Sequence, residues 1–595
     1  MVQRIFDIVE KRVGKLPDST MLAAKEGGEW RTYSSKEVWE MARKLCGGIE
    51  SLGIKNQVLE PEHQEKIAIV SPNRPEWIIT DIGVQMTGAV LTPLYPTISP
   101  GEMEYILKES EVRIVFIANQ ELYDRFKPAF DNCPTVTNIY SFDKVNGATH
   151  WEELIDKNLA PDQSVIDRIN IETLATIIYT SGTTGNPKGV MLSHKNIVSN
   201  VYDSMPAFTF AERGAKTLSF LPLNHIFERT VSYIYIEAEL QIYYAESMDT
   251  IGDNLREVKP LVFTTVPRLL EKVYERILGK GLELKGIKRL LFFWALKLGF
   301  KFDNADRGSW WYRFQLSIAN KLIFSKWREA LGNNVKAIVT GSAPCQPRLI
   351  RVFTAARIII MEGYGLTETS PVVSVNRFES DGRRIGSIGT LIDNVEVKIM
   401  EDGEIWCRGN NIMMGYYKHP DLTKEVLTDD GWLKTGDIGE WTEWRFLKIT
   451  DRKKEIFKTS GGKYVAPQPI ENKLKESIFI EQLMVIGAGK KFVSALIVPA
   501  YDHLRNKLKD DGVTASANND ELIKQPEAIA VIQKQIDKFN PLFSHVEQIK
   551  KFELMPNEWT IDTGELTPSL KIKRKKILEK YASQIDDIYD ENAGF

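Results

Sequence analysis

The sequence predicts an α/β protein with a large N-terminal domain of doubly wound α/β sheets, a small β subdomain and a small α+β C-terminal domain. Short apolar runs alternate with helical patterns through residues 1–170, an order typical of a mostly parallel sheet with helices on its faces. Glycines separate short β-like runs in residues 385–450, which indicates the β subdomain. At 595 residues the chain exceeds what one hydrophobic core usually serves, so we expect at least two domains.

Individual elements follow from the apolar pattern. A helix is predicted from Pro75 to Met86. The C-terminal domain is predicted as residues 451–595, after an N-terminal domain of residues 1–450. Apolar runs predict strands at 66–70, 89–94, 112–117, 174–178, 218–221, 335–339 and 358–360 in the first domain and at 485–487 and 495–499 in the second.

Composition excludes several classes of protein. With 43% apolar and 26% charged residues the chain is typical of a soluble globular protein, and a net charge of −3 gives no reason to expect nucleic acid as a partner. Residues 1–15 lack the apolar core of a signal peptide. The cysteines form no C-x-x-C pair, which argues against a zinc site and indicates a reducing compartment, so we expect a cytoplasmic protein. The four cysteines are Cys46, Cys133, Cys345 and Cys407.

One apolar segment, residues 290–296, has two interpretations. Seven apolar residues are too few to cross a bilayer, which takes about 20. The pattern favours a core helix; the alternative is a basic-flanked patch resting on the inner face of a membrane that supplies a lipidic substrate. A second apolar pattern is predicted as core packing on one helix face, formed by Trp311, Phe314, Ile318 and Leu322.

The stretch Tyr179–Val190 carries the clearest chemical signal. It follows a predicted buried strand and combines three glycines with hydroxyl side chains and one lysine. Glycines let backbone N–H groups approach an anion, and hydroxyls and Lys188 add donors and charge, so the stretch is predicted to bind phosphate. It is not a Walker A loop, because Gly189 follows Lys188. A flexible surface turn is the alternative. The predicted phosphate-binding residues are Thr180, Ser181, Gly182, Thr183, Thr184, Gly185 and Lys188.

Three further stretches follow predicted strands, where open α/β sheets place their ligands. They are Pro222–Arg229, which contains His225, then Thr340–Pro344 and Glu362–Thr369. A lone histidine is more often structural. The last two stretches are predicted as ligand-binding loops, and ordinary βα turns are their alternative.

In this order the stretches resemble the signatures of the AMP-forming adenylating enzymes, which include acyl-CoA synthetases, luciferases and the adenylation domains of peptide synthetases. The matches run from Thr176 to Lys576. Two features resemble the long-chain acyl-CoA synthetases in particular. The helix-rich region 251–334 is long, and residues 569–571 read Ser-Leu-Lys where many members have Ser-Gly-Lys.

The resemblance implies an ATP site assembled from these stretches. Tyr364 would stack on the base, and Glu368 with Thr183 would hold Mg²⁺ bridging the phosphates. Asp437, in a tight turn, and Arg452 would hold the ribose. His225 would lie near the reacting carboxylate. The remaining implied nucleotide contacts are Gly341, Ser342, Ala343, Glu362, Gly363, Gly365 and Thr367.

The resemblance also implies that the C-terminal domain is mobile. Lys454 matches the hinge about which this domain rotates, and Gly461 and Gly462 match a loop lining the channel for the thiol. Lys571 aligns with the catalytic lysine, although Lys573 lies close by. The alternative for Lys571 is a basic tail on a helix.

The implied activity is that of an AMP-forming acid–thiol ligase. ATP would activate a long-chain fatty acid through acyl-AMP, and coenzyme A would accept the acyl group. Two alternatives stay open: an acyl-acyl-carrier-protein synthetase or fatty acyl-AMP ligase with the same first half-reaction, and an inactive nucleotide sensor that keeps the fold. The sequence gives neither the acyl chain length nor the oligomeric state.

Overall fold

The computed structural model describes residues 2–54, 58–180, 186–305, 308–567 and 571–590. The chain divides into two compact units. The first comprises Met1–Lys398, Trp406–Lys434 and Thr442–Leu447, and the second comprises Ile399–Ile405, Thr435–Trp441 and Lys448–Phe595. The boundary between residues 450 and 451 stays a prediction.

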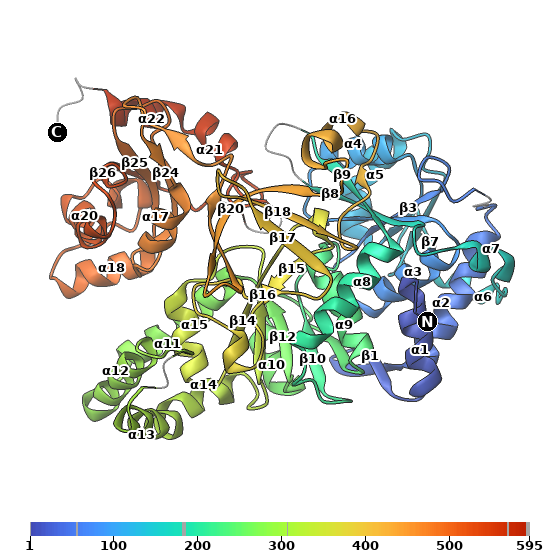
Figure 1. The fold of residues 1–595 in the computed structure, drawn as a ribbon, viewed down its shortest axis with the longest axis horizontal. Coiled ribbons are helices and arrows are strands. Elements are labelled where there is room, and N and C mark those ends of the chain that lie inside the picture. The colour runs from blue at the N-terminus through green and yellow to red at the C-terminus, as the bar shows by residue number, and fades with distance from the viewer. Residues whose placement is uncertain (1, 55–57, 181–185, 306–307, 568–570, 591–595) are drawn as a thin grey trace. The chain divides into compact units, whose positions relative to one another are not determined.

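An eight-stranded sheet in the first unit has the order β19-β9-β8-β4-β3-β5-β6-β7 (Figure 1). The strands β8, β4, β3, β5, β6 and β7 pair in parallel, and β9 pairs antiparallel with β8 and β19. The predicted strands are confirmed, because each is a short buried apolar run. The strands are β3 (Lys66–Val70), β4 (Val90–Leu94), β5 (Val112–Ile117), β6 (Asn138–Ser141), β7 (Thr149–His150), β8 (Leu174–Thr180), β9 (Lys188–Ser193) and β19 (Gly415–Tyr416).

A nine-stranded sheet in the same unit has the order β16-β15-β14-β13-β12-β10-β11-β1-β2. Its central strands are parallel, while β15, β16 and β2 are antiparallel additions at the two ends. The strands are β1 (Thr20–Glu26), β2 (Glu29–Ser34), β10 (Lys216–Ser219), β11 (Gln241–Tyr244), β12 (Val262–Thr265), β13 (Ala337–Thr340), β14 (Ile359–Gly365), β15 (Val372–Val375) and β16 (Thr390–Leu391).

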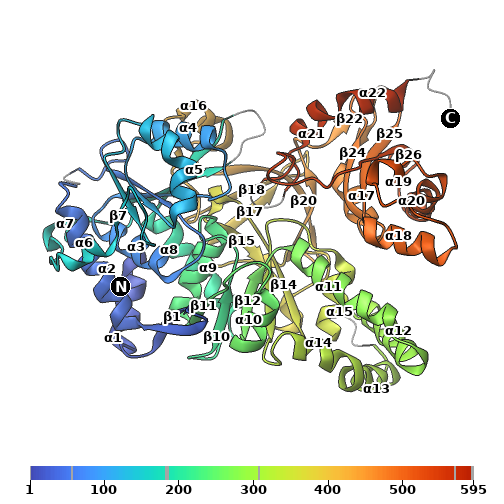
Figure 2. The ribbon, with the colours of Figure 1, turned by 180° about the vertical axis from the view of Figure 1, so that it is seen from behind.

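Helices cover both sheets, as the predicted doubly wound class requires. Figures 1 and 2 show α3, α8 and α9 between the two sheets, and α3 has the predicted bounds. The helices of this unit are α1 (Ile5–Lys15), α2 (Ser35–Glu50), α3 (Pro75–Met86), α4 (Pro100–Ser110), α5 (Gln120–Asp131), α6 (Glu152–Asp156), α7 (Gln163–Arg168), α8 (His194–Ser204), α9 (Ile226–Glu237), α10 (Ile251–Val258), α11 (Pro267–Glu283), α12 (Gly286–Phe300), α13 (Trp310–Ala319), α14 (Ser325–Ala330), α15 (Pro347–Ala355) and α16 (Pro420–Val426).

A four-stranded sheet with the order β17-β18-β20-β21 forms the predicted small β subdomain. Its strands are β17 (Val395–Ile399), β18 (Glu404–Gly409), β20 (Leu433–Thr442) and β21 (Phe446–Arg452).

The second unit contains a three-stranded sheet with apolar clusters on both faces. Strand β25 is central, antiparallel to β24 and parallel to β26, which confirms the predicted α+β class. A short hairpin of β22 and β23 precedes it. The elements are β22 (Phe457–Lys458), β23 (Tyr464–Val465), α17 (Pro467–Leu474), β24 (Ile480–Ile486), β25 (Val493–Pro499), α18 (Tyr501–Asp510), α19 (Asn519–Leu522), α20 (Pro526–Phe539), β26 (Ile549–Leu554), α21 (Arg574–Lys580) and α22 (Ala582–Tyr589).

The prediction that the apolar face of α13 packs in the core was wrong. The exposed fractions of Trp311, Phe314 and Leu322 are 53%, 52% and 50%. The spacing does place these residues on the same helical segment, but the described residues of the first unit leave about half of each side chain exposed. In α12, Phe292, Ala295 and Leu296 are buried, whereas Leu290 is 71% exposed. The core interpretation of residues 290–296 therefore holds for one face of the helix only. Among the described residues, no helix is both long and apolar enough to cross a membrane.

Helix α1 is fixed to the first unit through a buried histidine. The backbone N–H of Ile5 donates to Nδ1 of His194 at 3.2 Å, and the ring of Phe6 lies edge-on to the imidazole. Burial, with a smaller effect of the Arg4 charge, lowers the pKa of His194 to about 3. The imidazole is therefore neutral in the folded protein and accepts the hydrogen bond that holds the start of α1.

We expect this histidine to make the protein less stable as the pH falls. An unfolded histidine takes up a proton below about pH 6.5, whereas the folded one does so only near pH 3, so the unfolded state gains protons first. Within that window, each unit by which the pH falls lowers the free energy of unfolding by up to about 1.4 kcal/mol. Melting temperatures of the wild type and of His194→Asn, which keeps an acceptor but does not titrate, should converge as the pH falls from 6.5 to 5. Parallel curves would contradict the assignment.

Candidate functional site

Three predicted loops meet at the carboxyl ends of β10, β13 and β14. Gly341 directly follows β13. A Cβ atom on Gly341 would lie 3.3 Å from the carbonyl oxygen of Gly363 and 3.7 Å from Cζ of Phe227. The backbone at Gly341 is therefore in close contact with the two other stretches, and this contact brings together residues that lie more than a hundred positions apart in sequence. The next residue, Ser342, has a positive φ of 68°.

The first residues of the stretch Glu362–Thr369 form a strand, which corrects the prediction of a loop. β14 continues to Gly365, because it pairs in parallel with β13 as far as Glu362 and then antiparallel with β15. A Cβ atom on Gly365 would lie 1.7 Å from the carbonyl oxygen of Pro371, so the close pairing requires glycine there. Tyr364 and Thr367 are both buried in the described structure.

Glu362 joins two of these stretches. Its Oε1 accepts a hydrogen bond from the backbone N–H of Cys345 at 2.7 Å. Burial raises the pKa of the Glu362 carboxyl to about 8, and the Cys345 N–H opposes that shift. This carboxyl therefore fixes the position of the segment that follows Ala343.

His225 is the N-cap residue of α9. Its Nδ1 accepts from the backbone N–H of Phe227 at 3.1 Å, so a structural role for this ring is certain. The following turn is held by Glu228, which is fully buried and accepts hydrogen bonds from the hydroxyls of Ser219 and Thr264. Burial raises the pKa of Glu228 to about 7, and the two hydroxyls oppose that shift. These bonds tie the start of α9 to β10 and β12 and thereby position His225.

The predicted phosphate-binding stretch begins and ends in two strands that pair with each other. Thr180 ends β8, Lys188 begins β9, and the two residues pair across the strands. The predicted residues Ser181, Gly182, Thr183, Thr184 and Gly185 lie outside the described residues.

Tyr416 connects Lys188 to Glu368. The Nζ of Lys188 lies 5.3 Å from the centre of the Tyr416 ring, and the Tyr416 hydroxyl donates to Oε1 of Glu368 at 2.8 Å. Burial, reinforced by the Glu368 charge, raises the pKa of Tyr416, so the hydroxyl keeps its proton. The sequence analysis missed Tyr416, because only the pairing of β19 with β9 places it beside Lys188.

Glu368 is suited to a magnesium ion that arrives with phosphates. No group of three His, Cys, Asp or Glu side chains that could hold a metal occurs among the described residues. Mg²⁺ in nucleotide sites is commonly bound through one or two carboxylates together with substrate phosphates and water. A single carboxylate oriented by Tyr416 fits that mode. The second predicted ligand, Thr183, lies outside the described residues.

In the second unit, the predicted ribose-binding residues lie together. Nε of Arg452 is 3.2 Å from Oδ1 of Asp437, and Asp437 is buried. Asp437 lies within strand β20, which corrects the prediction of a tight turn. The neighbouring Gly436 has a positive φ of 73°, so the strand is locally irregular there.

The predicted hinge and thiol loop lie close together in sequence and are both exposed. Lys454 occupies a turn between β21 and β22. Gly461 and Gly462 form the turn of the β22–β23 hairpin, and a Cβ atom on Gly462 would meet no atom within 4 Å. The backbone N–H of Thr459 donates to the carbonyl oxygen of Lys463 at 3.0 Å and closes this hairpin.

Lys571 lies beside a β-bridge between Leu566 and Ile572. The backbone N–H of Lys571 donates to Oγ1 of Thr567 at 3.0 Å, and the carbonyl oxygen of Lys571 accepts from the Thr567 N–H at 2.8 Å. The segment that follows Lys571 is held in place by Arg574, a residue that the sequence analysis did not single out. Its guanidinium forms ion pairs with Glu455, at 3.2 Å, and with buried Glu471.

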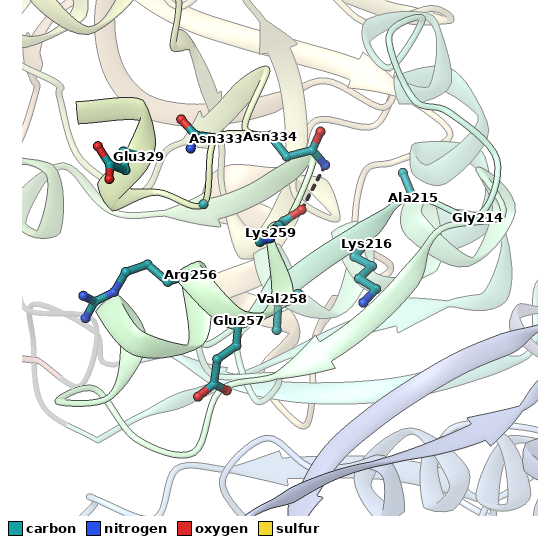
Figure 3. A pocket seen from close by; sticks show the side chains of 11 residues that line it. Gly214, Ala215, Lys216, Arg256, Glu257, Val258, Lys259, Glu329, Asn333 and Asn334 are labelled. Carbon is teal, nitrogen blue, oxygen red and sulfur yellow. Dashed lines mark hydrogen bonds between the residues drawn. The ribbon is translucent and has the colours of Figure 1, made fainter. Parts of the chain in front are cut away.

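A surface hollow of about 830 Å³ in the first unit lies at the opposite edge of the nine-stranded sheet (Figure 3). Its lining comes from residues just before β10, β12 and β13, including Lys216, Lys259 and Asn334. Asn334 donates to the carbonyl oxygen of Lys259 at 2.9 Å, as the dashed line shows. Ligands of open α/β sheets bind at the carboxyl ends of the strands, so this hollow at the amino ends is not the predicted site.

Comparison with known proteins covers nearly the whole chain. Residues 9–417 match the AMP-binding enzyme family, and residues 454–593 match the AMP-binding enzyme C-terminal domain. A long-chain-fatty-acid–CoA ligase of Mycobacterium bovis is 32% identical over 587 residues, which is 96% of this chain and 95% of that protein. Long chain acyl-CoA synthetase 4 of Arabidopsis thaliana is 32% identical, over 98% of this chain and 91% of that protein.

Two solved structures share the fold at lower identity. The adenylation domain of a carboxylate reductase from Mycobacterium chelonae superposes with a TM-score of 0.77 at 20% identity, covering 98% of this chain and 91% of that one. The anthranilate CoA ligase AuaEII, in complex with anthranoyl-AMP, gives a TM-score of 0.73 at 17% identity, covering 98% of each chain.

Proposed function

The chain belongs to the AMP-binding enzyme family, and we propose that it is a long-chain-fatty-acid–CoA ligase that uses ATP and releases AMP and pyrophosphate. The observation that carries the proposal is the 32% identity, along nearly the whole chain, to proteins named as such ligases. The contact between Lys188, Tyr416 and Glu368 supports it, because a phosphate-binding lysine and a magnesium-binding carboxylate must lie close together.

In the first half-reaction, a carboxylate oxygen of the fatty acid attacks the α-phosphorus of ATP. A new P–O bond forms, the bond to pyrophosphate breaks, and acyl-AMP results. Two anions must meet, so the protein mainly orients them and supplies positive charge. Lys188 and the 181–185 loop bind the phosphates, Lys571 stabilises the developing charge, and His225 lies near the carboxylate. Bound through Glu368 and Thr183, Mg²⁺ would neutralise phosphate charge.

The same site holds the rest of the nucleotide. Tyr364 stacks on the adenine, beside the backbone of Gly341, Ser342 and Ala343. Asp437 and Arg452 bind the ribose hydroxyls. The backbone of Glu362, Gly363, Gly365 and Thr367 completes the predicted contacts.

In the second half-reaction, the coenzyme A thiol loses its proton and its sulfur attacks the acyl carbonyl carbon. The bond from that carbon to the AMP oxygen breaks, which releases acyl-CoA and AMP. Rotation at Lys454 withdraws Lys571 and brings the Gly461–Gly462 turn to the carbonyl. The turn suits this role because its glycines carry no side chain that would obstruct a thiol-bearing arm.

The acceptor and place of action belong to the same proposal. We place the protein in the cytoplasm, where its four buried cysteines, none of them in a disulfide, would stay reduced. An acyl carrier protein as the thiol donor, or no thiol at all, is the second candidate, because either would use the same first half-reaction.

The deciding experiment supplies Mg-ATP, coenzyme A and a series of fatty acids from short to very long. AMP and acyl-thioester formed in equal amounts, with a maximum at long chains, would support the proposal. Pyrophosphate release without thioester formation would favour the second candidate, in which a carrier protein or no thiol accepts the acyl group. ATP binding without pyrophosphate release for any acid would favour an inactive nucleotide sensor.

We expect Tyr416→Phe to raise the Mg²⁺ concentration needed for half-maximal pyrophosphate release about tenfold, since a hydrogen bond to a charged group contributes about 1.5–3 kcal/mol. The control is Tyr417→Phe, because the Tyr417 hydroxyl is buried without a hydrogen-bond partner among the described residues. Removing that hydroxyl should leave the magnesium dependence unchanged. Identical magnesium curves for the two variants would show that Tyr416 does not orient Glu368.

A further inference from the structure

Glu109, near the end of α4, gathers side chains from three parts of the first unit that lie far apart in sequence. Its Oε1 accepts hydrogen bonds from the Tyr105 hydroxyl at 2.9 Å and from Nε2 of His419 at 2.7 Å. The Tyr179 hydroxyl lies beside the same carboxylate, because burial, and then the charge of Glu109, raises the pKa of Tyr179. The Glu109 side chain is only 11% exposed. We call Tyr105, Glu109, Tyr179 and His419 the Glu109 cluster, and none of them is among the proposed ATP contacts.

The Glu109 cluster contacts the phosphate-binding stretch at both ends. Tyr179 directly precedes the first predicted phosphate-binding residue. At the other end, burial and then the hydrogen bond to Glu109 raise the pKa of Tyr105 to about 12, whereas a hydrogen bond from the Asn186 side chain opposes the rise. The Tyr105 hydroxyl therefore donates to Glu109 and accepts from Asn186, which lies two residues before Lys188.

Gly189 makes room for the ring of Tyr179. The two residues pair across β8 and β9. A Cβ atom on Gly189 would lie 2.7 Å from Cγ2 of Ile177 and 3.1 Å from Cζ of Tyr179, so a side chain there would displace the ring. The Tyr179 ring therefore lies over the backbone of β9 at the residue that follows Lys188, and a displacement of the ring would be transmitted to the backbone at Lys188.

His419 is fixed by contacts that join α4 to β9. It is the N-cap residue of α16, and Figures 1 and 2 both show α16 beside α4. The backbone N–H of Tyr417 donates to the carbonyl oxygen of Gly189 at 2.8 Å. Nζ of Lys418 donates to the carbonyl oxygen of Glu109 at 2.8 Å, at the end of the helix where carbonyl groups lack partners within the helix. These contacts hold the end of α4 beside the start of β9.

We propose that Glu109 is a positioning residue for ATP: it fixes Tyr179 and Asn186, and through them it fixes where Lys188 meets the phosphates. The proposal rests on the proposed function, because there Lys188 is a phosphate-binding residue. Glu109 itself need not touch the nucleotide. A displacement of about 1 Å far from the chemistry can cost about a hundredfold in rate, so a carboxylate that orients both ends of the stretch should control how ATP binds.

The test is calorimetric titration of the full-length protein with Mg-ATP, together with Michaelis constants from pyrophosphate release. Glu109→Ala should weaken Mg-ATP binding about tenfold, because it removes hydrogen bonds to a charged group. The Michaelis constant for ATP should rise by a similar factor, while the constant for the fatty acid stays unchanged. A variant that merely folded less completely would instead lower the maximal rate and leave both Michaelis constants unaltered.

The matched control is Glu104→Ala on the same helix, because Glu104 forms a surface ion pair with Lys108. This variant should bind Mg-ATP like the wild type. Tyr105→Phe, which removes only the hydroxyl between Glu109 and Asn186, should weaken binding about fivefold. Glu109→Ala combined with Tyr105→Phe should bind no more weakly than Glu109→Ala alone, since residues that act through one hydrogen bond are not additive.

Unchanged Mg-ATP affinity in Glu109→Ala, or equal losses in Glu109→Ala and Glu104→Ala, would overturn the inference. If Glu109→Ala melts far below the wild type, the affinity of Tyr105→Phe decides instead. Calorimetry needs no turnover, so the two proposals can be separated. If Glu109→Ala weakens Mg-ATP binding but the wild type forms no AMP with any acid, the ligase proposal fails and the positioning role stands. If the wild type forms acyl-CoA and Glu109→Ala keeps its affinity, the ligase proposal stands and the positioning role fails.

Discussion

Lys571→Ala should slow acyl-AMP formation about 10²- to 10³-fold, the usual effect of removing a preorganised charge that stabilises a transition state. Thiol attack on supplied acyl-AMP should proceed at nearly the wild-type rate, because we expect Lys571 to be withdrawn in that half-reaction. Pyrophosphate release measures the first step, and thioester formation from synthetic acyl-AMP measures the second.

Lys573→Ala is the matched control. Ile572 packs against an apolar cluster of the second unit, and alternation along an extended segment places Lys571 and Lys573 on its opposite side. The geometry therefore permits either lysine to be the catalytic one, and the kinetics decide. A selective loss in Lys573→Ala would move the assignment by two residues. If Lys571→Ala slows both half-reactions equally, Lys571 does not act in the first half-reaction alone.

Much of the fold could be predicted because its strands are buried on both faces. Such strands appear in sequence as short continuous apolar runs, and β3 and β5 have the predicted bounds for that reason. The helix α3 begins at a proline, a residue preorganised for the first turn, and it too was predicted to the residue. The local sequence pattern was sufficient to predict an element wherever its bounds did not depend on contacts with distant residues.

The remaining features depend on contacts between distant residues. Glu362–Gly365 was expected to be a loop because its glycines are typical of turns, but pairing with β15 makes it a strand. Tyr416 gave no signal, since its importance comes from a partner strand more than two hundred residues earlier. The role of Arg574 likewise depends on its ion pairs with Glu455 and Glu471, which lie about a hundred residues earlier in the sequence.

In α13, the apolar periodicity of the sequence predicted which residues share a face but not whether that face is buried. The spacing of Trp311, Phe314 and Leu322 predicted an apolar face correctly but could not say what covers it, and these residues are half exposed. A helix pattern predicts amphipathicity, whereas burial depends on the tertiary structure.

Asp81→Ala should lower the free energy of unfolding of the first unit by about 3–5 kcal/mol, the cost of leaving a buried charge without its partner. Asp81 in α3 and Arg229 in α9 form an ion pair in which neither side chain is exposed. Arg229 donates to both carboxylate oxygens, at 2.8 and 2.6 Å, and the Tyr233 hydroxyl donates to Asp81 at 2.8 Å. The pair joins α3 to the helix whose first residues position His225.

The control is Asp131→Ala, which breaks an ion pair with Lys127 on the surface of α5. Exposed pairs contribute only about 0–1 kcal/mol, so this variant should unfold nearly like the wild type. Denaturant titration followed by tryptophan fluorescence suits the comparison, because the buried Trp77 ring lies 5.7 Å from the Arg229 guanidinium carbon. If Asp81→Ala and Asp131→Ala lose equal stability, the buried pair does not hold α3 and α9 together. A large loss in Asp81→Ala that Asp81→Leu with Arg229→Met largely restores would show that the unpaired charge, rather than the missing contact, is what destabilises the unit.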